Sequence, residues 1–347
     1  MINDTFLKAC FRQPTSYTPV WMMRQAGRYL PEYRAVRAKT DFLTLCKTPE
    51  LAAEVTIQPV DIIGVDAAII FSDILIVPEA MGMHLIVEEG RGGPQFPKPL
   101  RSSSDIEKII IPDPTDKLKY VMDALRLTRK LLNGRVPLIG FSGSPWTLAS
   151  YMVEGRGSKN FRYVKEMIYN EPKLAHILLE KLTKSVATYL KAQIEAGAQA
   201  VQIFDTWGGI LSQDAFQEFS LQYIEQVISE IKVDGVPVIV FCKDCGHSLD
   251  KIALTGCNVV GLDWTIDIGD ARKSVGNRVA LQGNMDPTIL YSKPERIRQE
   301  VKSILAKFGK GTGHIFNLGH GILPDIPVDH AKELIRAVKE ESITYHS

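Results

Sequence analysis

The sequence has no excess of charge of either sign. Across 347 residues, lysine and arginine number 41 and aspartate and glutamate number 40, which gives a formal net charge of +1. A protein that coats nucleic acid or an anionic membrane needs a basic surface that this balance does not supply. We therefore expect neither nucleic acid nor a membrane as a partner, while a local basic site stays compatible with the balance.

The sequence also lacks an apolar run long enough to cross a membrane. A spanning helix needs ~18 or more apolar residues without charge. The most apolar stretch, residues 65–87, is interrupted by Asp66, Asp73, Glu79 and His84. Residues 1–5, MINDT, include neither a basic segment nor an apolar one, so we expect no targeting segment.

Cysteine is scarce and odd in number. The five cysteines are Cys10, Cys46, Cys242, Cys245 and Cys257. This pattern fits reduced thiols in a cytoplasmic protein better than a disulfide framework. Cys242 and Cys245, with His247 nearby, have the spacing of a zinc or redox site, but no second CxxC or Cys–His cluster accompanies them. Because a structural zinc site usually takes a second pair of ligands, we favour an interpretation without metal.

Eight short apolar runs bounded by turn signals predict strands. They are residues 19–23, 67–71, 137–141, 200–204, 237–241, 258–262, 278–282 and 314–318. Segments with helical periodicity separate most of them, and this alternation is typical of a parallel sheet covered on both faces. The length would allow two domains, but a count of eight favours a single (β/α)8 barrel over residues 1–347.

Helix starts and one irregular segment are also visible. Thr48-Pro49-Glu50 predicts the start of a helix, and Ser104 and Glu107 have the spacing of a capping box. An apolar stripe over residues 172–196 predicts one long, half-buried helix. The alternating pattern of residues 83–101 predicts an inserted, hairpin-like arm.

The positions just after the predicted strands are polar, and in a barrel these positions carry the chemistry. Arg24 and Arg28 flank an Ala-Gly turn directly after the first run. Guanidinium groups present a fixed fork of donors, so the pair suits a carboxylate or phosphate clamp. The alternative is a pair of surface ion pairs to Glu32 or Asp41.

Asp73 and His320 are further candidates at strand ends. Asp73 follows five apolar residues, and a buried carboxylate requires partners. The alternative is that Asp73 caps the next helix. His320 lies between Gly319 and Gly321, where a ligand can approach the backbone closely. The alternative is an exposed or structurally hydrogen-bonded histidine.

Seven segments, in order along the chain, resemble motifs of the uroporphyrinogen decarboxylase family. They are PVWMMRQAGRYLPEYR (19–34), IIFSDIL (69–75), GFSGSPWTLASYMVEG (140–155), FDTWGG (204–209), GLDW (261–264), QGNMDP (282–287) and NLGHGILPD (317–325). They extend over nearly the whole chain, and agreement at seven sites is far more specific than one short motif.

The resemblance implies a single (β/α)8 barrel, a homodimer with active-site clefts facing one another, and no metal or organic cofactor. It also implies decarboxylation of the four acetate side chains of uroporphyrinogen III to methyl groups. That reaction gives coproporphyrinogen III and four CO2 in porphyrin and heme biosynthesis. The substrate-binding residues carried over by position are Arg24, Gln25, Ala26, Gly27, Arg28, Asp73, Tyr151, Thr206 and His320, of which Asp73, Arg24 and Arg28 would be catalytic. Family members often carry an aromatic residue near Leu43, where this chain has Phe42.

The implied chemistry suits these side chains. Direct loss of CO2 would leave a carbanion beside an electron-rich pyrrole, so the ring must first be protonated at carbon and become an electron sink. An ionised Asp73 would accept hydrogen bonds from pyrrole N–H groups and stabilise the ring cation, and nearby arginines would favour its ionisation. We expect Arg24 and Arg28 to orient the substrate's carboxylates. Arg24 is the first choice as proton donor, but a guanidinium group is a poor proton donor at neutral pH, which leaves a bound water or a substrate carboxylic acid as alternatives.

Two other functions stay open from the sequence alone. Zinc-dependent, cobalamin-linked methyltransferases of similar fold bind zinc through His-x-Cys and a later cysteine. This chain has no histidine two residues before Cys242 or Cys245, and no cysteine in residues 317–325. A non-catalytic tetrapyrrole-binding protein would use the same cleft.

The basic residues are not evenly spread along the chain. Within residues 1–50, eight lysines and arginines stand against four aspartates and glutamates. This local excess surrounds the loop assigned to carboxylate binding, so the balanced total charge is compatible with a polyanionic substrate.

Overall fold

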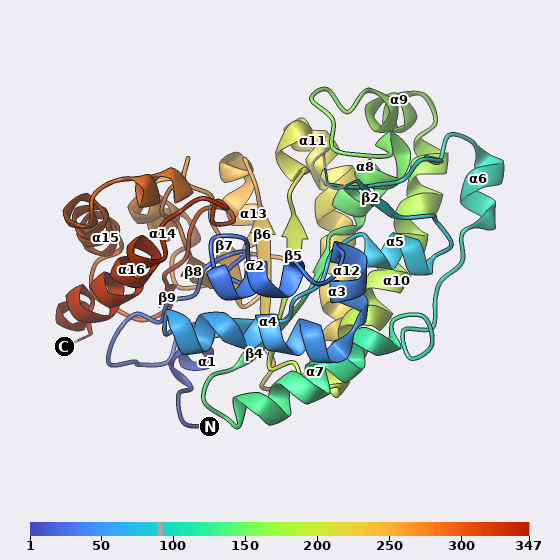
Figure 1. Ribbon diagram of the computed structural model, residues 1–347. Coiled ribbons are helices and arrows are strands. Elements are labelled where there is room, and N and C mark those ends of the chain that lie inside the picture. The colour runs from blue at the N-terminus through green and yellow to red at the C-terminus, as the bar shows by residue number, and fades with distance from the viewer. Residues whose placement is uncertain (89–92, 347) are drawn as a thin grey trace.

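The computed structural model describes residues 1–88 and 93–346, and a parallel sheet lies at its centre (Figure 1). Its strands, in sheet order, are β1 (Ala68–Ile69), β4 (Leu138–Gly143), β5 (Ala200–Asp205), β6 (Val238–Cys242), β7 (Val259–Gly261), β8 (Ala280–Gln282) and β9 (His314–Ile315). Sheet order follows chain order, and every neighbouring pair is parallel. The predicted mixed α/β fold with a parallel sheet is therefore confirmed.

The first predicted strand, residues 19–23, is the exception. In this segment only Val20 forms a bridge, parallel to Phe316. Pro19 has no N–H to donate to a ladder, although its carbonyl accepts from Phe316 N at 2.8 Å. The carbonyl of Val20 accepts from Asp66 N at 2.8 Å. The segment therefore contacts residues beside both β1 and β9, and the two edges of the sheet curl toward it.

Helices separate the strands and cover the sheet. The longer ones are α4 (Pro49–Ile62), α7 (Lys119–Leu132), α8 (Pro145–Glu154), α9 (Arg162–Asn170), α10 (Pro172–Glu195), α12 (Gln222–Ile231), α14 (Ile268–Val275), α15 (Pro294–Phe308) and α16 (Val328–Glu341). The shorter α-helices are α1 (Thr5–Cys10), α2 (Pro31–Arg37), α3 (Phe42–Lys47), α5 (Ile76–Ala80), α6 (Ser103–Lys108), α11 (Gln213–Phe216) and α13 (Leu249–Ile252). A π-helical turn, η2 (Gln217–Leu221), joins α11 to α12. The 3-10 turns are η1 (Gly208–Ile210), η3 (Gly246–Ser248), η4 (Pro287–Tyr291) and η5 (Ile343–Tyr345). In the part of the chain that the structure describes, no helix is long and apolar enough to cross a bilayer.

The predicted helix starts agree only in part with the structure. Proline at the first position of α4 is confirmed, but the Thr48 hydroxyl donates to Thr44 O instead of capping α4. The capping box at Ser104 and Glu107 is wrong. Helix α6 begins two residues earlier than that spacing needs, and the box is formed by Ser102 and Asp105.

The long helix predicted over residues 172–196 is confirmed as α10, which begins with a proline and contacts α7, α8 and α12. Its stripe is buried from Leu174 to Leu190, whereas Ile177 lies 47% exposed outside the stripe. Helix α10 therefore packs one face against its neighbours and leaves the other to solvent.

The predicted arm is an antiparallel hairpin of β2 (Ile86–Glu88) and β3 (Gly93–Gln95). Residues 89–92, within the predicted arm, lie outside the described residues. The arm continues along α8, because Phe96 N donates to Gly155 O and Leu100 N donates to Met152 O. Gly155 ends α8 at φ +86°, a conformation that glycine adopts without cost.

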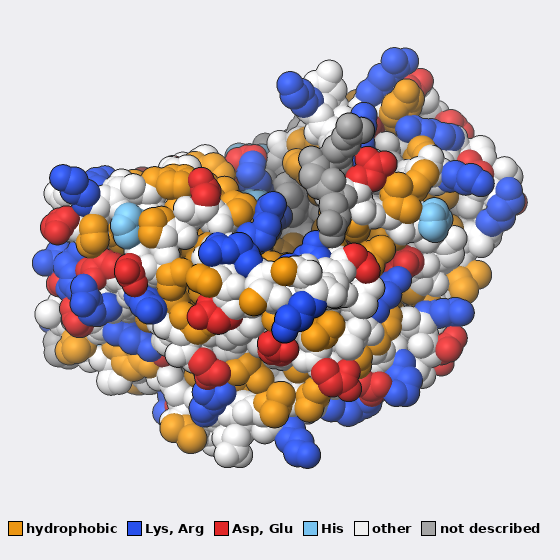
Figure 2. Space-filling view, in the orientation of Figure 1, with side chains coloured by type: hydrophobic (Ala, Val, Ile, Leu, Met, Phe, Trp, Pro, Cys, Tyr) orange, Lys and Arg blue, Asp and Glu red, His pale blue; other side chains and the backbone are white. Residues whose placement is uncertain are grey.

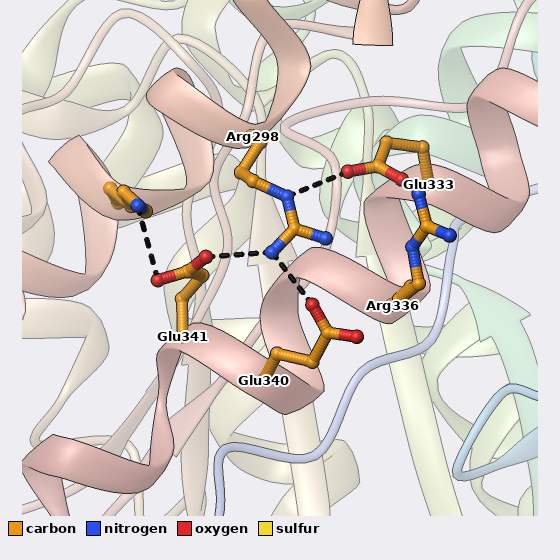
Figure 3. A network of polar contacts seen from close by, with 6 residues as sticks. Arg298, Glu333, Arg336, Glu340 and Glu341 are labelled. Atoms are coloured by element: carbon orange, nitrogen blue, oxygen red, sulfur yellow. Dashed lines mark hydrogen bonds and ion pairs between the residues drawn. The ribbon is translucent and has the colours of Figure 1, made fainter. Parts of the chain in front are cut away.

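A charged network joins α15 to α16 near the C-terminus (Figure 3). Arg298 donates to Glu333 at 2.8 Å and to Glu341 at 2.6 Å, and it pairs with Glu340 at 2.7 Å. Glu333 is buried and also accepts from Arg336. One guanidinium therefore holds three carboxylates of α16 against α15.

Candidate active site

The C-terminal ends of the parallel strands bring the predicted site residues to one edge of the sheet. Asp73 follows β1, Thr206 follows β5 and His320 follows β9. Tyr151 lies on α8, which begins two residues after β4, and the Arg24–Arg28 loop follows Val20. Figure 2 shows lysine and arginine side chains, in blue, gathered over α2 beside a hollow between the part with α14–α16 and the part with α8 and α9.

Arg24 lies directly against the His320 loop. Its backbone adopts φ +62°, which is uncommon for a residue with a side chain. A β-carbon added to Gly321 would overlap Cδ of Arg24. The side chain of Arg24 therefore extends across Gly321, next to His320.

The loop from Arg24 to Arg28 is anchored by hydrogen bonds between the Gln25 side chain and backbone groups. Gln25 is 1% exposed; its amide donates to Ala67 O at 2.9 Å and accepts from Met22 N at 3.1 Å. Gly27 is needed because a β-carbon there would lie 2.8 Å from Arg24 O. Ala26 is half-buried. Gln25 therefore anchors the loop, and the exposed side chains of the loop are the two arginines.

The charge of Arg28 acts on Tyr33. Burial raises the pKa of Tyr33, and the charge of Arg28 is among those that lower it. Among the described residues, neither Arg24 nor Arg28 forms an ion pair with Glu32 or Asp41, so the surface-pair alternative is not what the structure shows.

Asp73 presents one free carboxylate oxygen. Its Oδ1 accepts from Leu75 N at 2.8 Å, whereas Oδ2 has no hydrogen-bond partner within residues 1–88 and 93–346. Leu75 is itself the cap residue before α5, so Asp73 closes a turn and does not cap that helix. Burial raises the pKa of Asp73, while the Leu75 N–H and the charge of Arg24 lower it. Arg24 thus acts in the expected direction, but burial outweighs it.

Tyr151 lies near Trp207, the residue that follows Thr206 in the chain. The rings of Tyr151 and Trp207 lie 6.0 Å apart, and Thr206 is half-buried beside Trp207. Burial raises the pKa of Tyr151; the charge of Asp73 raises it further and that of Arg24 lowers it. The pKa of Tyr151 therefore depends on the charges of both Asp73 and Arg24.

His320 is a neutral imidazole at physiological pH. Burial lowers its pKa to about 4, and the positive charges of Arg24 and Lys243 add to this effect. Its ring lies 6.5 Å from the rings of Phe241 and Trp264. His320 is consequently a hydrogen-bonding group rather than an acid near pH 7.

Sequence reasoning missed Asp205, which ties several site elements together. Asp205 is fully buried and accepts from the hydroxyls of Ser144 at 2.6 Å, Thr147 at 2.7 Å and Ser220 at 2.6 Å. Thr147 Oγ1 in turn accepts from Trp207 N at 3.2 Å. The sequence signal that could have identified Asp205 is an acidic residue at the end of an apolar run. The same kind of signal made Asp73 a candidate.

Lys243 was also missed, although it directly follows β6 as Arg24 follows its own apolar run. It pairs with Asp244, and its Nζ lies 5.8 Å from the centre of the Trp264 ring. Thus a second positive charge lies near His320.

Cys242 ends β6, and Cys245 lies three residues later. Both thiols are buried, and Cys245 Sγ donates to Lys243 O. His247 instead lies with its ring 6.4 Å from that of Phe216. Over the described part of the chain, no group of three or more His, Cys, Asp or Glu residues is placed to hold a metal ion.

Comparison with known proteins decides the family. The family model described as "Uroporphyrinogen decarboxylase (URO-D)" matches residues 1–341. The chain belongs to the uroporphyrinogen decarboxylase family. Proteins named uroporphyrinogen decarboxylase from Chlorobium limicola and Pseudomonas putida (strain GB-1) are 59% and 60% identical to it, over 99% of this chain and 99% and 98% of theirs.

Solved structures support the fold of this uroporphyrinogen decarboxylase family member. A methyltransferase from Methanosarcina mazei superposes with a TM-score of 0.84 over 98% of both chains, at 21% identity. A B12-independent methionine synthase from Shewanella sp. W3-18-1 gives a TM-score of 0.56 at 11% identity, over 96% of both chains. At these identities the likeness concerns the fold alone, so it does not favour the methyltransferase alternative.

Proposed function

We propose that this protein converts uroporphyrinogen III to coproporphyrinogen III, replacing four acetate side chains with methyl groups and releasing four CO2. The observation that carries the proposal is the family match over residues 1–341. The geometry of the site is consistent with it, because a carboxylate with one oxygen that makes no hydrogen bond to the described residues, two exposed arginines and several hydrogen-bonding groups follow the strands. Such a site suits a polyanionic substrate with N–H donors at its centre.

Each acetate would leave in steps that balance in atoms and charge. A proton adds to the pyrrole α-carbon next to the ring carbon that bears the acetate, and the ring becomes a cation. The C–CO2 bond breaks, and its electron pair neutralises that cation by forming an exocyclic methylene on the ring carbon that bore the acetate. A proton adds to the methylene, and the α-carbon loses the proton that it gained. The net change consumes one proton per CO2, and because the ring is the electron sink we propose no metal or organic cofactor.

Asp73 is proposed to stabilise the ring cation. Its free Oδ2 is available to pyrrole N–H groups, and its Oδ1 is fixed by Leu75 N. Because burial raises the pKa of Asp73, the carboxylate is poorly solvated and gains more from N–H donors and a cation than an exposed one would. This supports a preorganised electrostatic role.

Arg24 and Arg28 are proposed to bind the substrate's carboxylates, with Tyr151, Thr206 and His320 holding its orientation. Since burial lowers the pKa of His320 to about 4, His320 is a poor proton donor near pH 7. The donor would then be Arg24, a bound water or a carboxylic acid of the substrate. Arg24 is the preferred protein group because it lies near both Asp73 and His320.

We further propose that residues 19–23 close the sheet into an eight-stranded barrel, and that residues 1–347 form one domain. The hydrogen bonds of Pro19 and Val20 toward both sheet edges support closure. A homodimer in the cytoplasm is part of the same proposal. The five free, buried thiols are consistent with the cytoplasm, and the family resemblance implies the homodimer.

Anaerobic incubation of the purified protein with uroporphyrinogen III tests the proposal. We expect CO2 release together with a ladder of hepta-, hexa-, penta- and tetracarboxylate products. Binding of the substrate without any decarboxylated product would instead favour a tetrapyrrole-binding protein. Stoichiometric zinc with activity lost on chelation would favour the methyltransferase.

A further inference from the structure

The backbone of Lys243 is fixed between the loops that follow β5 and β7. Lys243 N donates to Asp205 O at 3.1 Å, and Gly209 N donates to Lys243 O at 3.1 Å. The next residue, Asp244, donates its N–H to Asp263 Oδ2 at 2.6 Å. Lys243 therefore has a defined place among the loops that carry the site.

The side chain of Lys243 lies in a row with Trp264 and His320. Nζ is 5.8 Å from the centre of the Trp264 ring, and that ring meets the His320 ring edge to face at 6.5 Å. The Lys243 side chain is 25% exposed and Trp264 is 39% exposed, so substrate can reach both. An exposed tryptophan beside a cation offers an apolar face next to a charge.

Two positive charges act on His320 from separate loops. Arg24 lies across Gly321, and Lys243 lies beside Trp264. After burial, these two charges are the next causes that lower the pKa of His320. The carboxylates of Asp244 and Asp263 act on His320 in the opposite direction, and they come after the two cations in size. A carboxylate placed here would meet the two cations and a neutral ring N–H donor.

We propose that Lys243 and Trp264 form, with His320, a carboxylate subsite in addition to the Arg24–Arg28 loop. The subsite would take one acetate or propionate carboxylate of the tetrapyrrole, with the methylene groups of that side chain against Trp264. This inference rests on the proposed function. It answers a need of that function, because eight carboxylates require more cations than two arginines provide.

Asp244 is the competitor for Lys243 in the absence of substrate. The two side chains form an ion pair at the surface, and exposed pairs of this kind are weak. A substrate carboxylate would displace Asp244 from Lys243. Replacement of Lys243 should therefore weaken substrate binding, whereas replacement of Asp244 should not.

The test compares Lys243→Gln with Asp244→Asn in steady-state decarboxylation of uroporphyrinogen III. For Lys243→Gln we expect KM to rise about fivefold or more, with kcat within about twofold and a weaker dependence of kcat/KM on ionic strength. Lys243→Arg should restore most of the affinity. Asp244→Asn should leave KM unchanged or lower it, because asparagine also tolerates the φ of +58° at this position.

Two results would overturn the inference. One is a wild-type KM in Lys243→Gln. The other is an equal rise of KM in Lys243→Gln and Asp244→Asn, which would mean that the lysine serves only its ion pair. Lys184→Gln is the control variant, because it also removes one positive charge but lies on the exposed face of α10. Thermal melting of each variant shows whether it is folded. If the wild-type protein releases no CO2, the proposed function fails; if only the Lys243 effect is missing, the subsite alone fails.

Discussion

The side chain of Arg24 occupies the space in which a β-carbon of residue 321 would stand. The relationship joins the first polar loop of the chain to the last one, nearly three hundred residues later. Because Gly321 does not adopt a left-handed φ, an added β-carbon would meet the side chain of Arg24 first and would cause no backbone strain.

Replacing Gly321 by alanine should therefore displace Arg24 with little effect on stability. The overlapping atoms belong to a flexible side chain, which can move aside. We expect kcat/KM to fall at least about tenfold, since misplaced positioning groups commonly cost that much, while the melting temperature changes by no more than a few degrees. Gly157→Ala, whose β-carbon would lie 4.0 Å from the Trp207 ring, is the control. Unchanged kinetics in Gly321→Ala would argue against a role for the Arg24 position.

Asp73→Asn should lower activity without lowering stability. Loss of one aimed electrostatic group commonly costs about 2.7–4 kcal/mol, or roughly 10²–10³ in kcat. Because burial raises the pKa of Asp73, its ionised form at pH 7 is less favourable in the folded than in the unfolded chain. Removal of that charge should leave the melting temperature equal or raise it. Near-normal turnover of the variant would remove the cation-stabilising role from the mechanism.

The pH dependence of stability should reveal the buried His314. Burial lowers its pKa to about 3, against 6.5 for an ordinary histidine. The unfolded chain therefore binds a proton first, so stability is fully present above pH 6.5 and is lost as the pH falls toward 3. Between pH 6.5 and 4.5 the loss is on the order of 2–3 kcal/mol from this group.

His314→Gln tests that pH dependence. Urea unfolding should show a flatter decline of stability below pH 6.5 than in the wild type. The variant should be less stable at pH 8, because His314 stacks on Phe308 with ring centres 4.4 Å apart. His247→Gln, at an exposed histidine, should keep the wild-type slope. An unaltered slope in His314→Gln would contradict the assignment.

Arg298→Ala should destabilise the protein more than a neighbouring arginine substitution. It leaves the buried Glu333 with Arg336 and Glu341 with Lys302, and it removes the arginine partner of Glu340, which should cost about 2–4 kcal/mol. Among the described residues Arg296 pairs only with Glu300, on the same helix, so Arg296→Ala should cost about 0.5 kcal/mol or less. Chemical denaturation of both variants at one pH makes the comparison, and equal losses would mean that the network adds nothing.

The sequence predicted the alternation of strands and helices because short apolar runs and amphipathic segments are local signals. Seven of the eight runs are strands in the sheet. The start of α6 was misplaced by two residues, since Ser102 and Ser104 carry equally good capping hydroxyls and only packing selects one of them. The pattern of apolar and polar residues also could not show that the Gln25 side chain is buried. Its partners are backbone groups of residues 22 and 67, and backbone groups leave no signal in the sequence.

Three charged or polar residues of the candidate site were singled out from the sequence, but Lys243, Asp205 and the connections between the site residues were not. Arg24, Asp73 and His320 stand out after apolar runs, and the structure places them near one another. Asp205 was overlooked because its significance depends on three hydroxyls from two other segments. The direction of the Asp73 pKa likewise depends on burial, which a charge count does not include.

Helix α8 is fastened at both of its ends. Ser144 and Thr147 bind Asp205 at its start, and Met152 and Gly155 accept backbone hydrogen bonds from the arm at its end. The register of Tyr151 is thus set by contacts on either side of it. An insertion or deletion between Phe96 and Leu100 would therefore break one of the two backbone hydrogen bonds that hold the end of α8, and would change the position of Tyr151.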